Sequence, residues 1–115
     1  MKKLLVALFI LTFFSLSAQN DKKLQFDFDI NSFDKFDGVY LFPNPVKDNV
    51  TIEFDDYQNC SVYLFDLQGK RIFKQRVEDE IDATYDLTHL GSGTYLLFIV
   101  DEKKHLAINF KLQKI

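Results

Sequence analysis

Few side chains in this sequence are of types that could carry out a reaction. Cys60 is the single cysteine, and it stands in phase with Val62 and Leu64, so we expect it to point into an apolar core. A buried thiol behaves as a small hydrophobic group and not as a nucleophile. His89 and His105 fall in predicted turns, and two histidines with one buried thiol match no usual spacing of zinc ligands. We therefore predict neither a cysteine nucleophile nor a metal centre.

The acidic run from Asp27 to Asn31 superficially matches the opening of a calcium-binding loop. Such a loop requires glycine at its sixth position and a bidentate carboxylate at its twelfth, and Ser32 and Gly38 stand there. The sequence also lacks the serine-hydrolase elbow and the phosphate-binding glycine loop. We predict no catalytic site and no cofactor, and we expect that the chain is not an enzyme.

Residues 1–18 have the three parts of a secretory signal peptide. A basic start at Lys2 and Lys3 precedes an apolar run from Leu4 to Phe14, and small residues follow up to Ala18. The apolar run is too short for a transmembrane anchor, which needs about 20 residues. We predict cleavage after Ala18, or one residue earlier, and export to the periplasm.

The chain that remains is long enough for one domain. Removing residues 1–18 from 115 leaves 97, and the loss of Lys2 and Lys3 changes the formal net charge from −3 to −5. A mildly acidic chain gives no support for binding nucleic acid, which requires a basic patch. A single cysteine excludes an intramolecular disulfide, so stability has to come from an aromatic-rich core.

Alternating apolar and polar residues predict an all-β fold. Leu24 to Ile30, Val50 to Phe54 and Leu106 to Gln113 alternate with a period of two, which is typical of strands with one buried face. A turn is expected at Asp55 to Asn59, and Ile81 to Tyr85 is expected to form a separate short strand. About seven or eight short strands indicate an antiparallel β-sandwich.

We divide the chain after the signal peptide into two parts. Residues 19–38 form a short N-terminal extension with one predicted strand, Leu24 to Ile30, and residues 39–115 form the domain itself.

Two predicted strands are apolar on both of their faces. These are Val62 to Phe65 and Tyr95 to Val100, although a strand in a two-layer sandwich has one face in the core. Either the N-terminal strand or long polar side chains cover the second face, or this face is an exposed patch that meets a partner.

Four segments between Val39 and Ile115 resemble, in order, the type A C-terminal sorting domains of the type IX secretion system of Bacteroidetes. They are a Pro-Asn-Pro opening, a central hairpin, an aspartate-leucine-threonine segment that leads to glycine-x-tyrosine, and a closing strand with lysines. Thr88 stands where the family has serine. The residues that carry the resemblance are Pro43, Asn44, Pro45, Asp66, Gly69, Lys70, Asp86, Leu87, Gly93 and Tyr95.

The resemblance implies an Ig-like β-sandwich of about seven strands and a role as a secretion address. Shuttle and sortase-like components of the outer-membrane machinery recognise such domains in the periplasm, and the cargo is then secreted or attached to the cell surface. Only Gln19 to Gly38 separate the predicted signal from the domain here. Two alternatives therefore stay open: a small secreted β-sandwich used for adhesion or binding, and a remnant of a larger secreted protein.

Lys111 and Lys114 in the predicted closing strand are candidate recognition residues. The outer edge of this strand could pair with a receptor strand, while Pro43 and Pro45 would protect the other end of the domain from pairing. The alternative is that the lysines only solvate the strand.

Overall fold

A computed structural model describes residues 24–115, so the predicted signal peptide, residues 1–18, lies outside the described residues. Apart from one turn of 3-10 helix, η1 (Ile30–Ser32), all regular structure in the described part is β-strand, as predicted. The strands are β1 (Asp34–Lys35), β2 (Val39–Phe42), β3 (Asn49–Asp66), β4 (Arg71–Asp86), β5 (Gly93–Asp101) and β6 (Leu106–Lys114).

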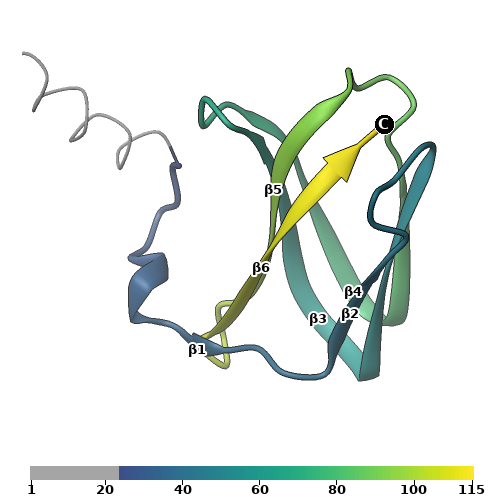
Figure 1. Cartoon of the computed structure of the whole chain (residues 1–115). Helices are drawn as coiled ribbons and strands as arrows, with labels where there is room; N and C mark the ends of the chain where they lie inside the picture. The colour runs from purple at the N-terminus through teal and green to yellow at the C-terminus, as the bar shows by residue number, and fades with distance from the viewer. Residues whose placement is uncertain (1–23) are drawn as a thin grey trace, which may run out of the picture.

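The strands form one sheet that curls back on itself (Figure 1). Its order is β1-β6-β5-β3-β2, and β4 pairs with β3. The first half of β3 pairs with β2, whereas its second half pairs with β5, so β3 belongs to both layers. Register shifts between Glu53 and Gln58, where β3 pairs with β4, allow both long strands to bend from one layer into the other. The result is a sandwich-like fold, mixed in direction because β1 is parallel to β6.

The bend explains why fewer strands form than the sequence indicates. The expected turn at Asp55 to Asn59 is wrong, because these residues continue β3 through the irregularity. The separate strand expected at Ile81 to Tyr85 is likewise the second half of β4. Polar residues at the bend point outward while the two strands stay paired on either side of it. Four predicted short strands are therefore two long ones.

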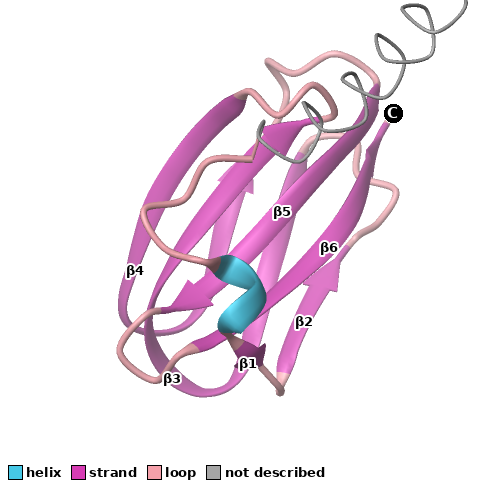
Figure 2. Ribbon diagram, turned by 90° about the vertical axis from the view of Figure 1, so that its left-hand side faces the viewer, coloured by secondary structure: helices cyan, strands magenta, loops and turns pink. Residues whose placement is uncertain are grey.

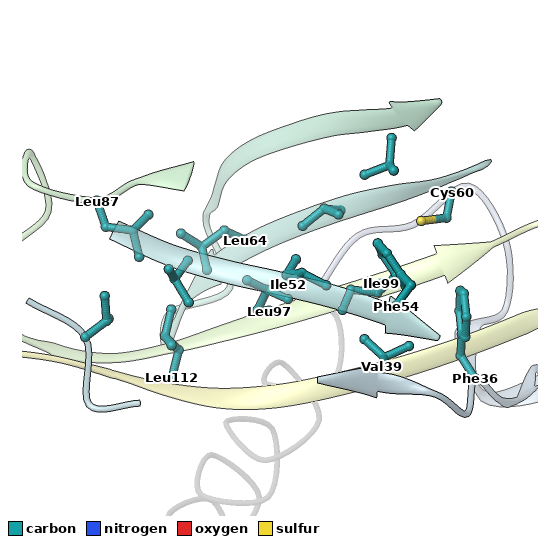
Figure 3. Packing of buried hydrophobic residues seen from close by; sticks show 14 residues of the cluster. Phe36, Val39, Ile52, Phe54, Cys60, Leu64, Leu87, Leu97, Ile99 and Leu112 are labelled. Atoms are coloured by element: carbon teal, nitrogen blue, oxygen red, sulfur yellow. The ribbon is translucent and has the colours of Figure 1, made fainter. Parts of the chain in front are cut away.

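The inner faces of the two layers enclose the main hydrophobic core (Figure 3). Val62 and Leu64 from β3 meet Leu97 and Ile99 from β5, and each of the four side chains is 0% exposed. Cys60 lies in the same cluster, which confirms its predicted burial. Burial of this apolar surface is the main source of stability in a domain without disulfides.

The outer face of the β5 layer carries a second hydrophobic cluster. Its buried residues are Tyr63, Phe65, Phe98 and Val100, and the N-terminal segment covers them. Figure 2 shows the loop with η1 lying in front of β5 and β6. Of the possibilities left open by the sequence, cover by the N-terminal segment is the one that the structure shows, although this segment is not a strand.

The strand predicted at Leu24 to Ile30 does not form, and this part of the prediction is wrong. Leu24, Phe26 and Phe28 are half-buried, and the polar residues between them are exposed. The alternation of apolar and polar residues therefore reflects burial of one side of an irregular segment and not a strand. Within residues 24–38, the part of the extension that the structure describes, the strand structure is β1, the two residues Asp34–Lys35.

Leu64 and Leu67 give a direct measure of how strongly the core stabilises the fold. Leu64 is fully buried, whereas Leu67 in the adjoining turn is 61% exposed. We expect Leu64→Ala to lower the free energy of unfolding by about 2–5 kcal/mol because it leaves a cavity. Leu67→Ala should change it by less than about 0.5 kcal/mol. Equilibrium denaturation of both variants checks this, and equal losses would contradict the assigned core.

Candidate functional site

The ten residues that carry the resemblance lie near one end of the sandwich. Asp66 is opposite Tyr95 in the sheet, Gly93 is opposite Lys114, and Lys114 also forms a bridge with Val46. We call this region the motif end and define it as residues 43–48, 66–70, 86–95 and 111–115. Figure 1 shows its loops at the end that carries the C mark.

Asp66 organises the turn between β3 and β4. Its Oδ1 accepts hydrogen bonds from the backbone N–H groups of Gln68 and Lys70, both at 2.9 Å. Gly69 has φ of +87° and donates its N–H to the Asp66 carbonyl at 3.0 Å. Glycine adopts this left-handed conformation without the steric cost of a Cβ. Both motif residues therefore define the shape of one tight turn.

Asp86 plays the same part in the loop between β4 and β5. Its Oδ1 accepts from the backbone N–H of Thr88 at 2.9 Å and from the Thr88 hydroxyl at 2.7 Å. These two hydrogen bonds lower the pKa of the Asp86 carboxyl, because they favour its charged form. The adjacent Leu87 is fully buried and fastens the loop to the core.

Tyr95 closes the loop from its other side. Its hydroxyl donates to the Gly91 carbonyl at 2.7 Å, and its ring packs against the main core. Gly93, two residues earlier, has φ of +147°, within the range that favours glycine. The glycine-x-tyrosine motif thus starts β5 and holds the preceding loop.

Asn44 fastens the Pro-Asn-Pro loop to the edge of β6. Its Nδ2 donates to the Lys111 carbonyl at 3.0 Å, and its Oδ1 accepts from the Gln113 N–H at 2.9 Å. Two residues on, the Val46 N–H donates to the Gln113 carbonyl at 2.7 Å. The loop therefore takes the place of a neighbouring strand.

The outer edge of β6 is consequently not open for pairing, and that prediction is wrong. The loop holds its C-terminal half, and β1 pairs with its start at Leu106 and Ala107. Pro43 and Pro45 also lie beside the final strand, not at the opposite end of the domain as expected. Both halves of the edge already have partners within the chain.

The two candidate recognition lysines differ in their exposure. Lys111 is exposed, and on the sheet it lies opposite Leu96. Lys114 is 8% exposed, in phase with the buried Leu112, and its amine donates to the Ile115 main-chain oxygen at 3.0 Å. Of these two lysines, only Lys111 has a side chain that is exposed to solvent.

A surface cavity of about 530 Å³ opens at the motif end. The motif residues Asp66, Lys70, Gly93 and Tyr95 line part of it, and Arg71 adds a second cation. Because the turns around this cavity are held by hydrogen bonds to their own backbone, its walls are preformed. A binding partner would meet a cavity of fixed shape in which Lys70 and Arg71 supply positive charge.

The Cys60 thiol and the His105 ring are not among the groups that line this cavity. Burial raises the pKa of the Cys60 thiol from 9.0 to about 12, with a further contribution from the nearby Asp101 carboxylate. The His105 ring stacks on Phe33 with centroids 3.8 Å apart, and its Nε2 is 3.0 Å from the Ser32 hydroxyl. Within residues 24–115, no group of three or more histidine, cysteine or carboxylate side chains could hold a metal ion.

A sequence-based reading misses two of these structural roles. The Asn44 side chain bonds to residues 67 and 69 positions away, and the Tyr95 hydroxyl closes a loop. The sequence signal for the role of Asn44 is its position between two prolines. Proline has no backbone N–H to donate to a neighbouring strand, so the side chain between the two prolines makes the hydrogen bonds instead.

The fold and this end together define a class of protein. It is a β-domain whose characteristic residues hold surface turns through hydrogen bonds to the domain's own backbone. Residues 40–112 match the family of secretion system C-terminal sorting domains. The chain belongs to this family, and its role is that of a sorting domain in type IX secretion, which implies export and release or display at the cell surface.

Two further similarities agree with this family. The chain is 27% identical over 67 residues to an endo-acting ulvan lyase of Formosa agariphila, a match that covers 58% of this chain and 13% of that enzyme. It also resembles PorZ, a surface component of the type IX secretion system of Porphyromonas gingivalis, with a TM-score of 0.58 and 24% identity over 69% of this chain and 12% of PorZ. The PorZ likeness supports the sandwich-like fold. In the described residues, no helix is long and apolar enough to cross a membrane.

Asn44→Asp tests how the Pro-Asn-Pro loop holds the edge of β6. The carboxylate cannot donate to the Lys111 carbonyl and would repel it. We expect a loss of about 1 kcal/mol in the free energy of unfolding and faster hydrogen exchange at the Gln113 amide. Asn109→Asp, an exposed change in the same strand, is the matched control and should leave both unchanged. Equal behaviour of the two variants would show that the loop does not hold this edge.

Cys60 should be unreactive in the folded chain. With its pKa at about 12, the thiolate is scarce at pH 8, so a thiol reagent should modify Cys60 only after unfolding. Folding raises the pKa of the Cys60 thiol, so this group makes a pH-dependent contribution to the free energy of unfolding. The contribution is fully present below pH 9 and is lost as the pH rises toward 12. The free energy of unfolding should therefore fall more steeply above pH 9 in the native sequence than in Cys60→Ala. Rapid labelling of the folded chain would contradict its burial.

Proposed function

We propose that this chain is a secretion address that outer-membrane components of the type IX system read in the periplasm. In this proposal residues 1–18 direct export across the inner membrane, and a shuttle or sortase-like component then binds the folded domain. Translocation across the outer membrane follows, with release or attachment to the cell surface. Membership of the sorting-domain family is the observation that carries the proposal.

The motif end supports the idea that the machinery reads a preformed surface. The side chains of Asp66, Asp86 and Asn44 each form hydrogen bonds with backbone groups of the domain itself, and Asp86 also accepts from the Thr88 hydroxyl. Their contribution to recognition is therefore to hold the loops in one shape. Lys111 is displayed at this end, and Lys70 and Arg71 line its cavity. We propose these three cations as the charged contacts of the receptor.

We further propose that the chain has no catalytic activity of its own. The Cys60 thiol is buried and held in its neutral form, and the His105 ring is packed on Phe33. Neither group lines the cavity at the motif end. A role in recognition requires no reactive side chain there.

A reporter fusion tests the address directly. Residues 24–115 would be placed behind a secreted reporter with its own signal peptide, in a host that has the type IX system. We expect the reporter to reach the medium or the cell surface. Lys111→Glu should reduce its export several-fold, because it reverses a displayed charge at the motif end.

Lys103→Glu is the matched control, because Lys103 is exposed in the turn between β5 and β6, at the opposite end of the sandwich. Its export should equal that of the unaltered fusion. Retention of every fusion in the periplasm would refute the secretion address and would favour the alternative of a binding module.

A further inference from the structure

The outer face of the β5 layer is built as a site for aromatic side chains. Its floor, which we call the aromatic face, consists of Tyr63, Phe65, Leu96, Phe98 and Val100. Residues 24–33, which we call the strap, lie across it and fall outside the segment 40–112 that matches the sorting-domain family.

Phe26 is the centre of the contact between strap and face. Its ring meets Tyr63, Phe65 and Phe98 edge-on, with centroid distances of 5.0, 5.4 and 5.2 Å. Phe28 packs against Phe26 at 5.3 Å. Edge-to-face geometry at these distances is the favourable one for aromatic pairs and adds to the gain from burial. The Phe26 ring is therefore surrounded by three rings of the face, with Phe28 beside it.

Side chains alone join the first part of the strap to the sheet. Residues 24–28 make no hydrogen bond to the rest of the domain, and the next bonds, at Asp29, Asn31 and Ser32, are mostly within the η1 turn itself. Backbone pairing to the body begins at Asp34, whose N–H donates to the His105 carbonyl. The strap can therefore leave the face without breaking a sheet ladder.

Cavities flank the strap on both sides. One of about 340 Å³ lies beside Ile30 and Phe33, and one of about 490 Å³ lies beside Gln25 and Asp27. The surface beside the strap is therefore hollowed at Ile30 and Phe33 and again at Gln25 and Asp27.

Charges around the groove complement those of the strap. Asp27 lines the same cavity as Lys70 and Arg71, and the Lys74 amine lies 5.4 Å from the centre of the Tyr63 ring. The exposed positions between the strap's aromatic residues are acidic at Asp27 and Asp29. Extended peptides that alternate aromatic and acidic residues fit both the floor and the rim.

We propose that the aromatic face is a peptide-binding site for an extended phenylalanine-aspartate-phenylalanine segment, occupied in this chain by its own strap. The strap is a ligand held in cis, and it exchanges with the same segment supplied in trans. The floor of this site lies outside the motif end, whereas its rim shares Lys70 and Arg71 with the contacts proposed for the receptor. Peptide binding to the purified chain is measured without export, so a negative result there would leave the secretion role untouched.

The test uses residues 19–115 with Phe26→Ser and Phe28→Ser and a labelled peptide of residues 24–33. We expect the variant to bind a hydrophobic dye and to bind the peptide at least about 10-fold more tightly than the unaltered chain does. The intact strap competes at a high effective concentration in the unaltered chain, and the peptide should displace the dye. Phe42→Ser, the same change at a phenylalanine of β2 that is 45% exposed and lies outside the aromatic face, is the matched control and should behave as the unaltered chain.

Two altered peptides separate the sources of affinity. A peptide with both phenylalanines replaced by serine should not bind, and one with Asp27→Lys and Asp29→Lys should bind several-fold more weakly, with less dependence on salt. Absence of peptide binding to a variant that still unfolds cooperatively would overturn the proposal.

Limited proteolysis of the unaltered chain tests the proposal without the double variant, and it therefore applies even if that variant fails to fold. Chymotrypsin should cut after Phe26 or Phe28 at a rate that barely changes with denaturant below the unfolding transition, because local release of the strap exposes these sites. Cleavage that requires global unfolding would make the strap an integral part of the core, and the peptide site would be refuted.

Discussion

The architecture depends on one constraint: the second half of β3 and most of β5 are apolar on both faces and need a cover on each. The curl of the sheet provides the inner cover, because it places Ile52 and Leu112 against Leu64 and Leu97. The N-terminal strap provides the outer cover through Phe26. Without either cover, a large apolar surface, aliphatic on the inner face and mainly aromatic on the outer face, would meet water at a substantial cost in free energy. The bend in β3 and the path of the strap both follow from this requirement.

A second constraint concerns the edge of the sheet. The N–H and C=O groups of an exposed final strand would invite pairing with other chains. Here β1 pairs with the start of β6. The Asn44 side-chain amide and the Val46 backbone form hydrogen bonds with the end of β6. Strand addition along this edge would have to displace these contacts first. In our proposal, a partner instead contacts the loops and the exposed Lys111 at the motif end.

The motif residues hold the conformation of turns and loops, and we assign them no reactive role. Asp66 and Asp86 hold their turns with charged oxygens that accept backbone N–H groups, and Gly69 and Gly93 allow the backbone conformations that these turns need. A family defined by such residues is one in which the shape of a surface is retained. This is consistent with our proposal that components of the secretion machinery read a folded surface of the domain.

By itself the sequence determined the all-β class, the burial of Cys60, the need to cover a two-faced apolar strand and the family. Each follows from local pattern, because alternation reports which side chains are buried, and motifs report turns. It did not determine which backbone groups pair. Leu24 to Ile30 alternates like a strand but makes no ladder, and the polar residues at Asp55 to Asn59 continue one. Only the tertiary structure decided that Asn44 binds Lys111, that Lys114 is buried and that the edge of β6 is closed. These outcomes depend on contacts between residues far apart in the chain, and periodicity carries no information about such partners.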